Sequence, residues 1–197
     1  MSLGAKPQIK IKMQELHFPT HALFFAGVLY RQDIYSLQQL RQLVEPAFPL
    51  GKLRPSAPGS FQNMTGHYTS EMVGDDFTND HLGHFFYVSS RPCARDDFAA
   101  LKIWAMGFED EHSHQGRRHI NLDVGMLSLE NMQLATHKPF AHRIYLGHGV
   151  YSDLTYIFSA GKFQFLPWTY PNYKNPEVVE FFQDVRNGLR SSLSTRT

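Results

Sequence analysis

Cysteine, charge and long apolar runs are all scarce in this chain of 197 residues. A single cysteine, Cys93, cannot form an internal disulfide, so nothing implies an oxidising compartment. The 19 Lys and Arg residues nearly balance the 18 Asp and Glu residues, so the electrostatic footprint of a nucleic-acid-binding protein is missing. The longest apolar stretch, Ala22 to Tyr30, is far shorter than the roughly 20 residues that span a bilayer. Because the N-terminus also lacks the apolar run of a signal peptide, we expect a cytoplasmic protein without a membrane or nucleic-acid partner.

Standard nucleotide-binding and hydrolase motifs are also missing. The two Gly-Lys pairs are followed by Leu53 and Phe163 rather than by Ser or Thr, so no GxxxxGK[ST] loop is present to cradle β- and γ-phosphates. No GxGxxG, GxSxG or HExxH pattern occurs. Cys93 has no cysteine partner for a thiolate zinc site, and we interpret it as a packed residue.

The 11 histidines are many for this length and raise the question of a metal site. His112-Ser-His114 and His81-x-x-His84 have the spacing of metal ligands. Neither pair is accompanied by a cysteine or carboxylate in a known zinc-site spacing. We therefore interpret both pairs as exposed histidines of polar loops.

The composition is that of a globular domain with a dense core. Hydrophobic residues make up 42% and aromatic residues 14% of the chain. We predict an extended N-terminal arm over residues 1–20, which are mostly polar, and a single domain over residues 21–193. Residues 21–30 read as a strand buried on both faces. A helix with Leu37, Leu40 and Val44 at helical spacing follows, and Asp33 or Ser36 can cap it.

The remaining elements follow from hydrophobic periodicity and turn residues. Strands are predicted near 61–70 and 83–90, a helix over 95–112, a strand over 119–124 and a short helix over 128–135. Strands over 142–146, 150–158 and 162–166 then form a meander, with turns at 147–149 and 159–161, and a helix begins at Pro176. The first six elements match a ferredoxin-like βαββαβ unit. The predicted fold is therefore an α+β sandwich with an antiparallel-rich sheet, a C-terminal β-meander and a final helix.

Polar side chains recur at a spacing of two on three of these strands. Asn121 and Asp123 share one face of their strand, and Tyr151, Asp153 and Thr155 share a face of theirs. Arg143 shares a face with Tyr145, whereas the alternation places His142 on the opposite face. If the chain turns at 147–149, Arg143 or Tyr145 lies beside Asp153 or Thr155. Such a set can hold a phosphate, a carboxylate or a hydrated cation, but it can equally be a salt-bridged face exposed to solvent.

The segment Trp168-Thr-Tyr-Pro-Asn-Tyr173 follows Pro167 and precedes the last helix. Three large aromatic residues and two prolines make a rigid loop. Trp168 or Tyr170 could stack on a ring or sugar of a ligand, although packing against the end of the sheet is the commoner role of such residues.

The segments Asn121-Leu-Asp-Val-Gly-Met-Leu-Ser-Leu, His142-Arg-Ile-Tyr-Leu-Gly-His-Gly-Val-Tyr151 and Leu166-Pro-Trp-Thr-Tyr-Pro-Asn-Tyr173 resemble the uncharacterised prokaryotic domain-of-unknown-function 4416 family. Tyr68-Thr-Ser-Glu-Met72 resembles a further segment of that family, and the resemblance spans residues 20 to 190. Val124 and Val73 depart from the family pattern in ways that affect turns rather than polar groups. Members often carry a GTP-binding label, which no phosphate-binding loop supports here. The resemblance points to eight positions to test, namely Glu71, Asp123, His142, Arg143, Asp153, Thr155, Trp168 and Tyr170.

Three functions remain open from the sequence. The first is binding of a small anionic ligand of nucleotide or sugar-phosphate type, with Arg143 on the anion, Thr155 donating a hydrogen bond, and Trp168 or Tyr170 on a ring. The second is a hydrolase or transferase in which Glu71, Asp123 and Asp153 hold Mg²⁺ or Mn²⁺ and His142 is the base, so that Asp123, His142 and Asp153 are catalytic. The third is a structural or protein-interaction module. The oligomeric state is not determined by these patterns.

Overall fold

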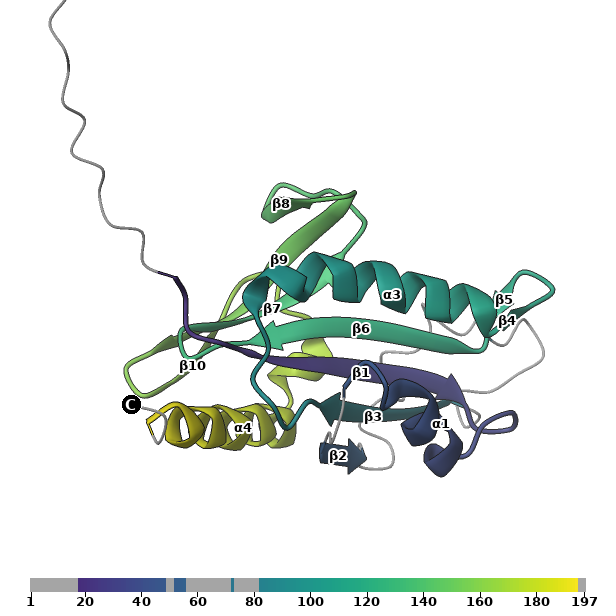
Figure 1. Cartoon of the computed structure of the whole chain (residues 1–197), viewed down its shortest axis with the longest axis horizontal. Coiled ribbons are helices and arrows are strands. Elements are labelled where there is room, and N and C mark those ends of the chain that lie inside the picture. Colours follow the sequence, from purple (N-terminus) through teal and green to yellow (C-terminus); the bar gives the residue numbers. More distant parts are fainter. Residues whose placement is uncertain (1–17, 49–51, 56–71, 73–81, 195–197) are drawn as a thin grey trace, which may run out of the picture.

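The computed structural model describes residues 18–48, 52–55, 72 and 82–194 (Figure 1). The predicted strand near 61–70 and the candidate metal ligand Glu71 lie outside these residues. The larger elements are β1 (Leu23–Arg31), α1 (Leu37–Val44), β2 (Lys52–Pro55), β3 (Leu82–Val88), α3 (Phe98–Glu111), β6 (Ile120–Leu127), β7 (Asn131–Thr136), β8 (Arg143–Gly147), β9 (Val150–Ser159), β10 (Lys162–Phe165) and α4 (Pro176–Ser194). Short 3-10 helices, η3 (Arg95–Asp97) and η4 (Pro171–Lys174), and a small hairpin of β4 (Ser113–His114) and β5 (Arg117–Arg118) complete them.

One antiparallel sheet organises the molecule. Its strand order is β10-β9-β7-β6-β1-β3-β2, and β8 pairs with β9 beside this path. Helices α1 and α3 cover one face, and α4 covers the other (Figure 1). The predicted α+β sandwich with an antiparallel sheet is therefore confirmed.

The sequence of β1 explains why both faces of the sheet are covered. Alternate residues of this apolar strand point to opposite faces, so Phe24, Ala26 and Val28 pack in the core beneath α1 and α3. Leu23 and Phe25 pack in the second core beneath α4. The Phe25 and Phe182 ring centroids, on β1 and α4, lie 4.8 Å apart. The strand thus contributes to both hydrophobic cores.

Local signals explain how α1 starts. Ser36 is the N-cap, because its hydroxyl oxygen accepts a hydrogen bond from the backbone N–H of Gln39 at 3.2 Å. The Gln39 side chain accepts one in return from the backbone N–H of Ser36, which completes a capping box. The alternative cap, Asp33, instead pairs with Arg31.

The segment 128–135 forms a turn followed by the strand β7, rather than the predicted helix. The Ser128 hydroxyl oxygen accepts hydrogen bonds from the backbone N–H groups of Glu130 and Asn131, and this forms a tight turn between β6 and β7. In the strand that follows, Met132 and Leu134 face the core beneath α4, and Ala135 faces the other core. A period of two, and not of 3.6, therefore describes these residues.

The edge of β6 is divided between a strand and a helix. β6 pairs with β7 only from Gly125 to Leu127, and no strand among the described residues pairs with that side of β6 before Gly125. Helix α3 covers this part of the edge. The Glu109 carboxylate accepts a hydrogen bond from the backbone N–H of Leu122. Lys102 Nζ donates a hydrogen bond to the carbonyl oxygen of the same residue at 3.4 Å. β8 and the part of β9 that pairs with it form an arm that projects beyond α3 and the rest of the sheet (Figure 1).

Candidate functional site

The β8–β9 hairpin brings Arg143 and Asp153 together. The two residues are direct cross-strand partners, and glycines with positive φ at positions 147 and 149 allow the tight turn that joins their strands. Arg143 Nε donates a hydrogen bond to Asp153 Oδ2 at 2.9 Å. The side chains are only 11% and 4% exposed, so this is a largely buried ion pair.

His142 reaches the same carboxylate oxygen, contrary to the strand alternation that predicts it on the opposite face. β8 begins at Arg143, and His142 lies in the preceding turn, where the alternation of a strand does not apply. Its Nε2 lies 3.3 Å from Asp153 Oδ2. One carboxylate oxygen of Asp153 therefore contacts both an imidazole and a guanidinium group.

The aromatic loop lies against these residues. The Trp168 ring stacks on the His142 ring with centroids 4.4 Å apart and an interplanar angle of 10°. Arg143 Nη2 donates to the Tyr170 hydroxyl at 3.1 Å. Trp168 is 36% exposed and Tyr170 is 46% exposed, so these rings lie at the surface rather than in the core. We call the five residues His142, Arg143, Asp153, Trp168 and Tyr170 the Arg143 cluster.

Hydrogen bonds to β9 hold the loop in place. Trp168 Nε1 donates to the Leu154 carbonyl oxygen at 2.8 Å. The hydroxyl of Thr169 donates to the Thr155 carbonyl oxygen at 2.7 Å and accepts from the backbone N–H of Leu166 at 2.9 Å. Trp168 is thus fixed through its own indole, and the backbone that carries Tyr170 is fixed through Thr169.

Thr155 is not part of the cluster surface. The strand register passes from Gln133–Leu154 to Met132–Tyr156, so Thr155 is the extra residue of a β-bulge and the alternation from Asp153 is broken there. The side chain is buried, and its hydroxyl donates to the Asp153 carbonyl oxygen at 3.2 Å. We therefore remove Thr155 from the proposed ligand donors.

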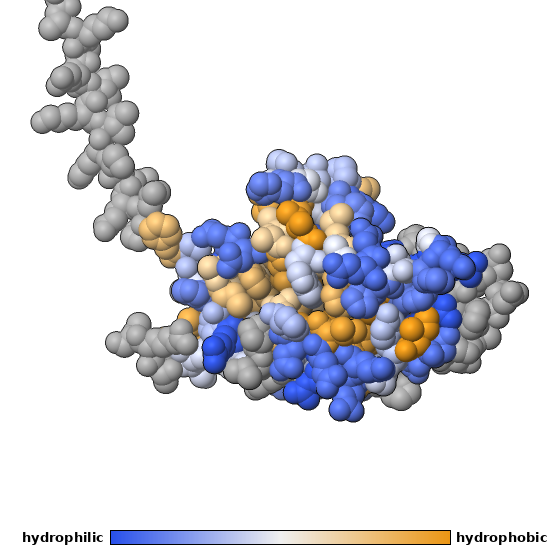
Figure 2. All heavy atoms as spheres, turned by 45° about the vertical axis from the view of Figure 1, so that its right-hand side comes forward, coloured by the Kyte–Doolittle hydropathy of each residue, from blue (hydrophilic) through white to orange (hydrophobic). Residues whose placement is uncertain are grey.

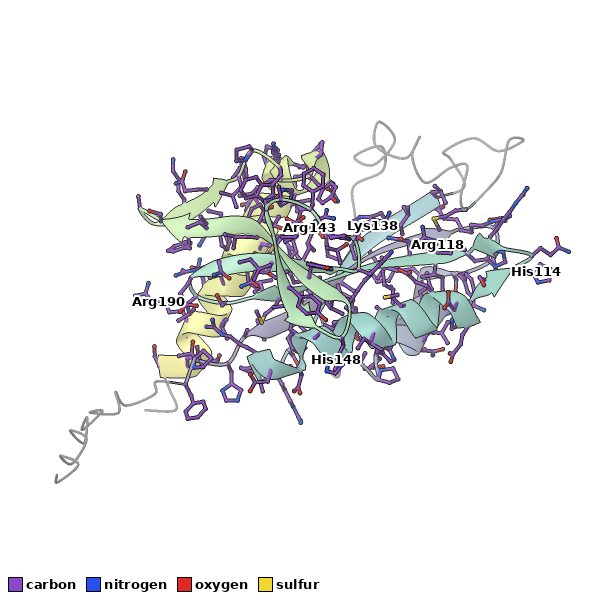
Figure 3. All side chains as sticks on the ribbon, turned by 90° about the horizontal axis from the view of Figure 1, so that it is seen from above. His114, Arg118, Lys138, Arg143, His148 and Arg190 are labelled. Atoms are coloured by element: carbon purple, nitrogen blue, oxygen red, sulfur yellow. The ribbon has the colours of Figure 1, made fainter. Side chains whose placement is uncertain are left out.

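Arg143 retains two N–H donors that its hydrogen-bond partners among the described residues do not use. Its guanidinium group carries five N–H groups. Within the described residues three of them are used, by Asp153, by Tyr170 and by the carbonyl oxygen of Lys138, which Nη1 contacts at 2.9 Å. One N–H on each terminal nitrogen remains, and Figure 3 shows Arg143 close to Lys138. No sequence pattern singles out Lys138, because it lies in a loop without a periodic pattern.

Asp123 lies outside the Arg143 cluster, on β6 opposite Gly27 of β1. Burial raises the pKa of this carboxyl group, although the charges of Lys102, Arg118 and Lys138 oppose the shift. The charges of the same three cations also act on His137, which directly follows β7. Burial and the charges of Lys102, Lys138, Arg118 and Arg143 lower its pKa. Lys102, Arg118 and Lys138 therefore act on both Asp123 and His137, and Arg143 acts on His137 as well.

The predicted metal site is not assembled among the described residues. No three His, Cys, Asp or Glu side chains gather there closely enough to hold a metal ion. Asp153 is engaged by Arg143 and His142, and a carboxylate already neutralised by a cation is a poor metal ligand. Of the predicted catalytic residues, His142 and Asp153 are in contact, whereas within the described part of the chain Asp123 forms no hydrogen bond or ion pair with either. Glu71 lies outside the described part of the chain.

Three further residues converge over Gly27. A Cβ at this glycine would lie 3.3 Å from Phe86 Cε1, 3.4 Å from the Tyr173 hydroxyl oxygen and 3.5 Å from His84 Nε2. His84 is half-buried, not a loop residue as the histidine spacing suggested, and burial lowers its pKa to about 3. The alternation of β3 could have revealed this, because His84 and Phe86 share a face.

The comparisons with known proteins agree with the sequence resemblance. Residues 20–188 match the model of a family described as "Domain of unknown function (DUF4416)", and the chain belongs to this family. No curated protein and no solved structure matches the chain. Among the described residues, no helix is long and apolar enough to cross a membrane.

Proposed function

We propose that this protein binds a small anionic ligand, of nucleotide or sugar-phosphate type, at the Arg143 cluster. One observation carries the proposal, which is the fixed guanidinium group beside exposed aromatic rings. Three hydrogen bonds orient Arg143, so its two remaining N–H groups are set in direction before a ligand arrives. A preorganised group loses little conformational freedom on binding, which favours affinity.

The chemistry of the cluster matches an anion joined to a ring. A guanidinium group presents parallel N–H donors to the oxygens of a phosphate or carboxylate. Lys138, an exposed residue whose carbonyl oxygen contacts Arg143, adds a positive charge nearby. The exposed parts of Trp168 and Tyr170 provide surfaces on which a base or sugar can pack. The anion and the ring of one ligand can therefore be bound by adjacent residues.

The metal-dependent hydrolase has less support. The contact of His142 with Asp153 could orient the imidazole as a general base. However, the described residues bring no metal ligands to it, so we place ligand binding first. An interaction module draws support from exposed Ile144, Tyr145 and Leu146 on β8, where Figure 2 shows apolar atoms among polar ones on the projecting arm.

We also infer two finer assignments. The order β6-β1-β3-β2, with α1 and α3 on one face, fits the ferredoxin-like arrangement expected from the βαββαβ element order. The single cysteine and the balanced charge favour a cytoplasmic protein that does not bind nucleic acid.

The test is a thermal-shift screen against nucleotides and sugar phosphates, with calorimetry of each hit. A ligand at about 100 times its Kd should add about 2.7 kcal/mol, or roughly 5–10 °C in Tm for a domain of this size. Arg143→Lys keeps a cation beside Asp153 but removes the guanidinium fork, so affinity for the hit should fall at least about tenfold. Arg190→Gln is the control, because it removes an exposed arginine from α4, away from Arg143 (Figure 3).

The control protein should bind as the wild type does. Unchanged affinity in Arg143→Lys would exclude the Arg143 cluster as the anion site. The proposal of an anion site fails if two results are found together. No nucleotide or sugar phosphate raises Tm, and inorganic phosphate does not shift the NMR signals of the Arg143 side chain.

A further inference from the structure

A cavity lies between α4 and the sheet. Its volume is about 270 Å³, near the lower end of the 300–1,000 Å³ that is usual for ligand sites. Leu23 of β1 and Val88 of β3 form its apolar wall on the sheet side. Phe181, Val185 and Leu189 line it from α4, where they share one face of the helix. None of these residues belongs to the Arg143 cluster.

Gly188 keeps this space open. It lies in the interior of α4, where glycine is unfavourable relative to alanine because of its backbone entropy. No close approach of another segment requires a glycine there, since a Cβ at this position would meet no heavy atom within 4 Å. Gly188 lines the cavity, so a larger side chain at this position would occupy space that is now empty.

Asp184 gives the cavity its charge. It lies one helical turn before Gly188, is exposed, and is the single charged residue among the described residues that line the cavity. Serine hydroxyl groups make up the rest of the polar lining. An apolar space with a carboxylate at its rim is complementary to a short hydrocarbon group that ends in a cation.

We propose that this cavity binds a small amphiphilic primary amine, with its hydrocarbon part against Leu23, Val185 and Leu189 and its ammonium group paired with Asp184. The size of the space accommodates a phenylethyl or hexyl group. This site is independent of the anion site, because it lies on α4 and has the opposite charge preference.

The experiment measures binding of phenethylamine to the full chain by ligand-observed NMR and by titration of protein amide shifts. Saturable binding is expected, with 2-phenylethanol binding more weakly and 3-phenylpropanoate more weakly still. Asp184→Asn should weaken amine binding about threefold to fivefold, as expected for an exposed ion pair, and should leave 2-phenylethanol unaffected. Gly188→Leu should abolish binding of all three probes.

Gly188→Ala is the folding control, and it should raise Tm because alanine is the better helix former. Phosphate added to the titration should not displace the amine, and Arg143→Lys should bind it as the wild type does, which separates this site from the anion site. Absence of saturable amine binding, equal binding of 3-phenylpropanoate, or unchanged binding in a folded Gly188→Leu protein would each overturn the proposal.

Discussion

Acid should destabilise this protein through His84. The ring lies edge-on to Phe86 with centroids 4.8 Å apart, and its Nε2 lies close to Gly27. Burial lowers the pKa of His84 from 6.5 to about 3. The folded state therefore keeps the ring neutral at pH values at which the unfolded chain already binds a proton.

The sign and size of the effect follow from this difference in pKa. The stability that depends on the neutral ring is complete above the unfolded pKa of about 6.5 and is lost as the pH falls toward the folded pKa. Each pH unit in this window costs about 1.4 kcal/mol. From pH 7 to pH 5 the loss is about 2 kcal/mol at most, because the half-buried ring retains some contact with solvent.

Urea unfolding at pH 7, 6 and 5, followed by circular dichroism, measures this loss. His84→Gln replaces the imidazole with an amide that does not titrate. Between pH 7 and pH 5 the wild type should lose about 1–2 kcal/mol more of its unfolding free energy than His84→Gln does. His21→Gln removes an exposed histidine and is the matched control, which should follow the wild type.

The pH dependence, and not the stability at one pH, decides the outcome. If His84→Gln is less stable at every pH because of altered packing, its unfolding free energy should still fall less between pH 7 and pH 5 than that of the wild type. Equal slopes for the wild type and His84→Gln would show that the folded protein accommodates the charged ring, and would refute the argument from burial.

Three further changes test the packing and the ion pairs. Arg143→Met leaves the buried Asp153 carboxylate without its guanidinium partner and should lower the unfolding free energy by about 3–5 kcal/mol, measured by urea unfolding. The double variant with Asp153→Asn should lose less than the sum of the two single variants. Gly125→Ala would place a Cβ 2.1 Å from Phe25 Cζ and 2.7 Å from the Gln133 carbonyl oxygen, so Tm should fall by several degrees, and an unchanged Tm would contradict this packing. Ser36→Ala removes the α1 cap and should cost about 1 kcal/mol, measured by denaturant midpoint, with Ser36→Asp restoring the loss.

Features of the fold that depend on residues close together in the sequence can be predicted from the sequence. The apolar run of β1, the Ser36 cap and the glycine-containing turns at 147–149 and 159–161 all appear as expected. Residues 128–135 were mistaken for a helix because Ser128 can begin a helix or a tight turn equally well. The pairing of β7 with β6 and β9 decided between the two, and such long-range pairing leaves no local signal.

The candidate site was predictable to a similar extent. Cross-strand spacing predicts that Arg143 or Tyr145 lies beside Asp153 or Thr155, and the register of the hairpin selects Arg143 opposite Asp153. Alternation failed at Thr155, where a bulge inserts a residue, and at His142, which precedes the strand. The contacts of Tyr170 with Arg143 and of Trp168 with His142 depend on a loop whose path is set by Thr169, and no periodicity encodes that path.

One edge of β6 is covered partly by β7 and partly by α3, and this explains where the charged side chains around Asp123 lie. A strand paired along its whole length would extend the flat sheet past Asp123. Instead, Glu109 and Lys102 of α3 bond the backbone of Leu122 in place of a neighbouring strand. β7 leaves β6 beyond Gly125, and the loop that follows β7 then carries Lys138 to Arg143. Lys102 and Lys138 are among the cations whose charges oppose the raised pKa of Asp123, so the helix that completes the sheet edge and the loop that follows β7 both bring positive charge toward this carboxyl group.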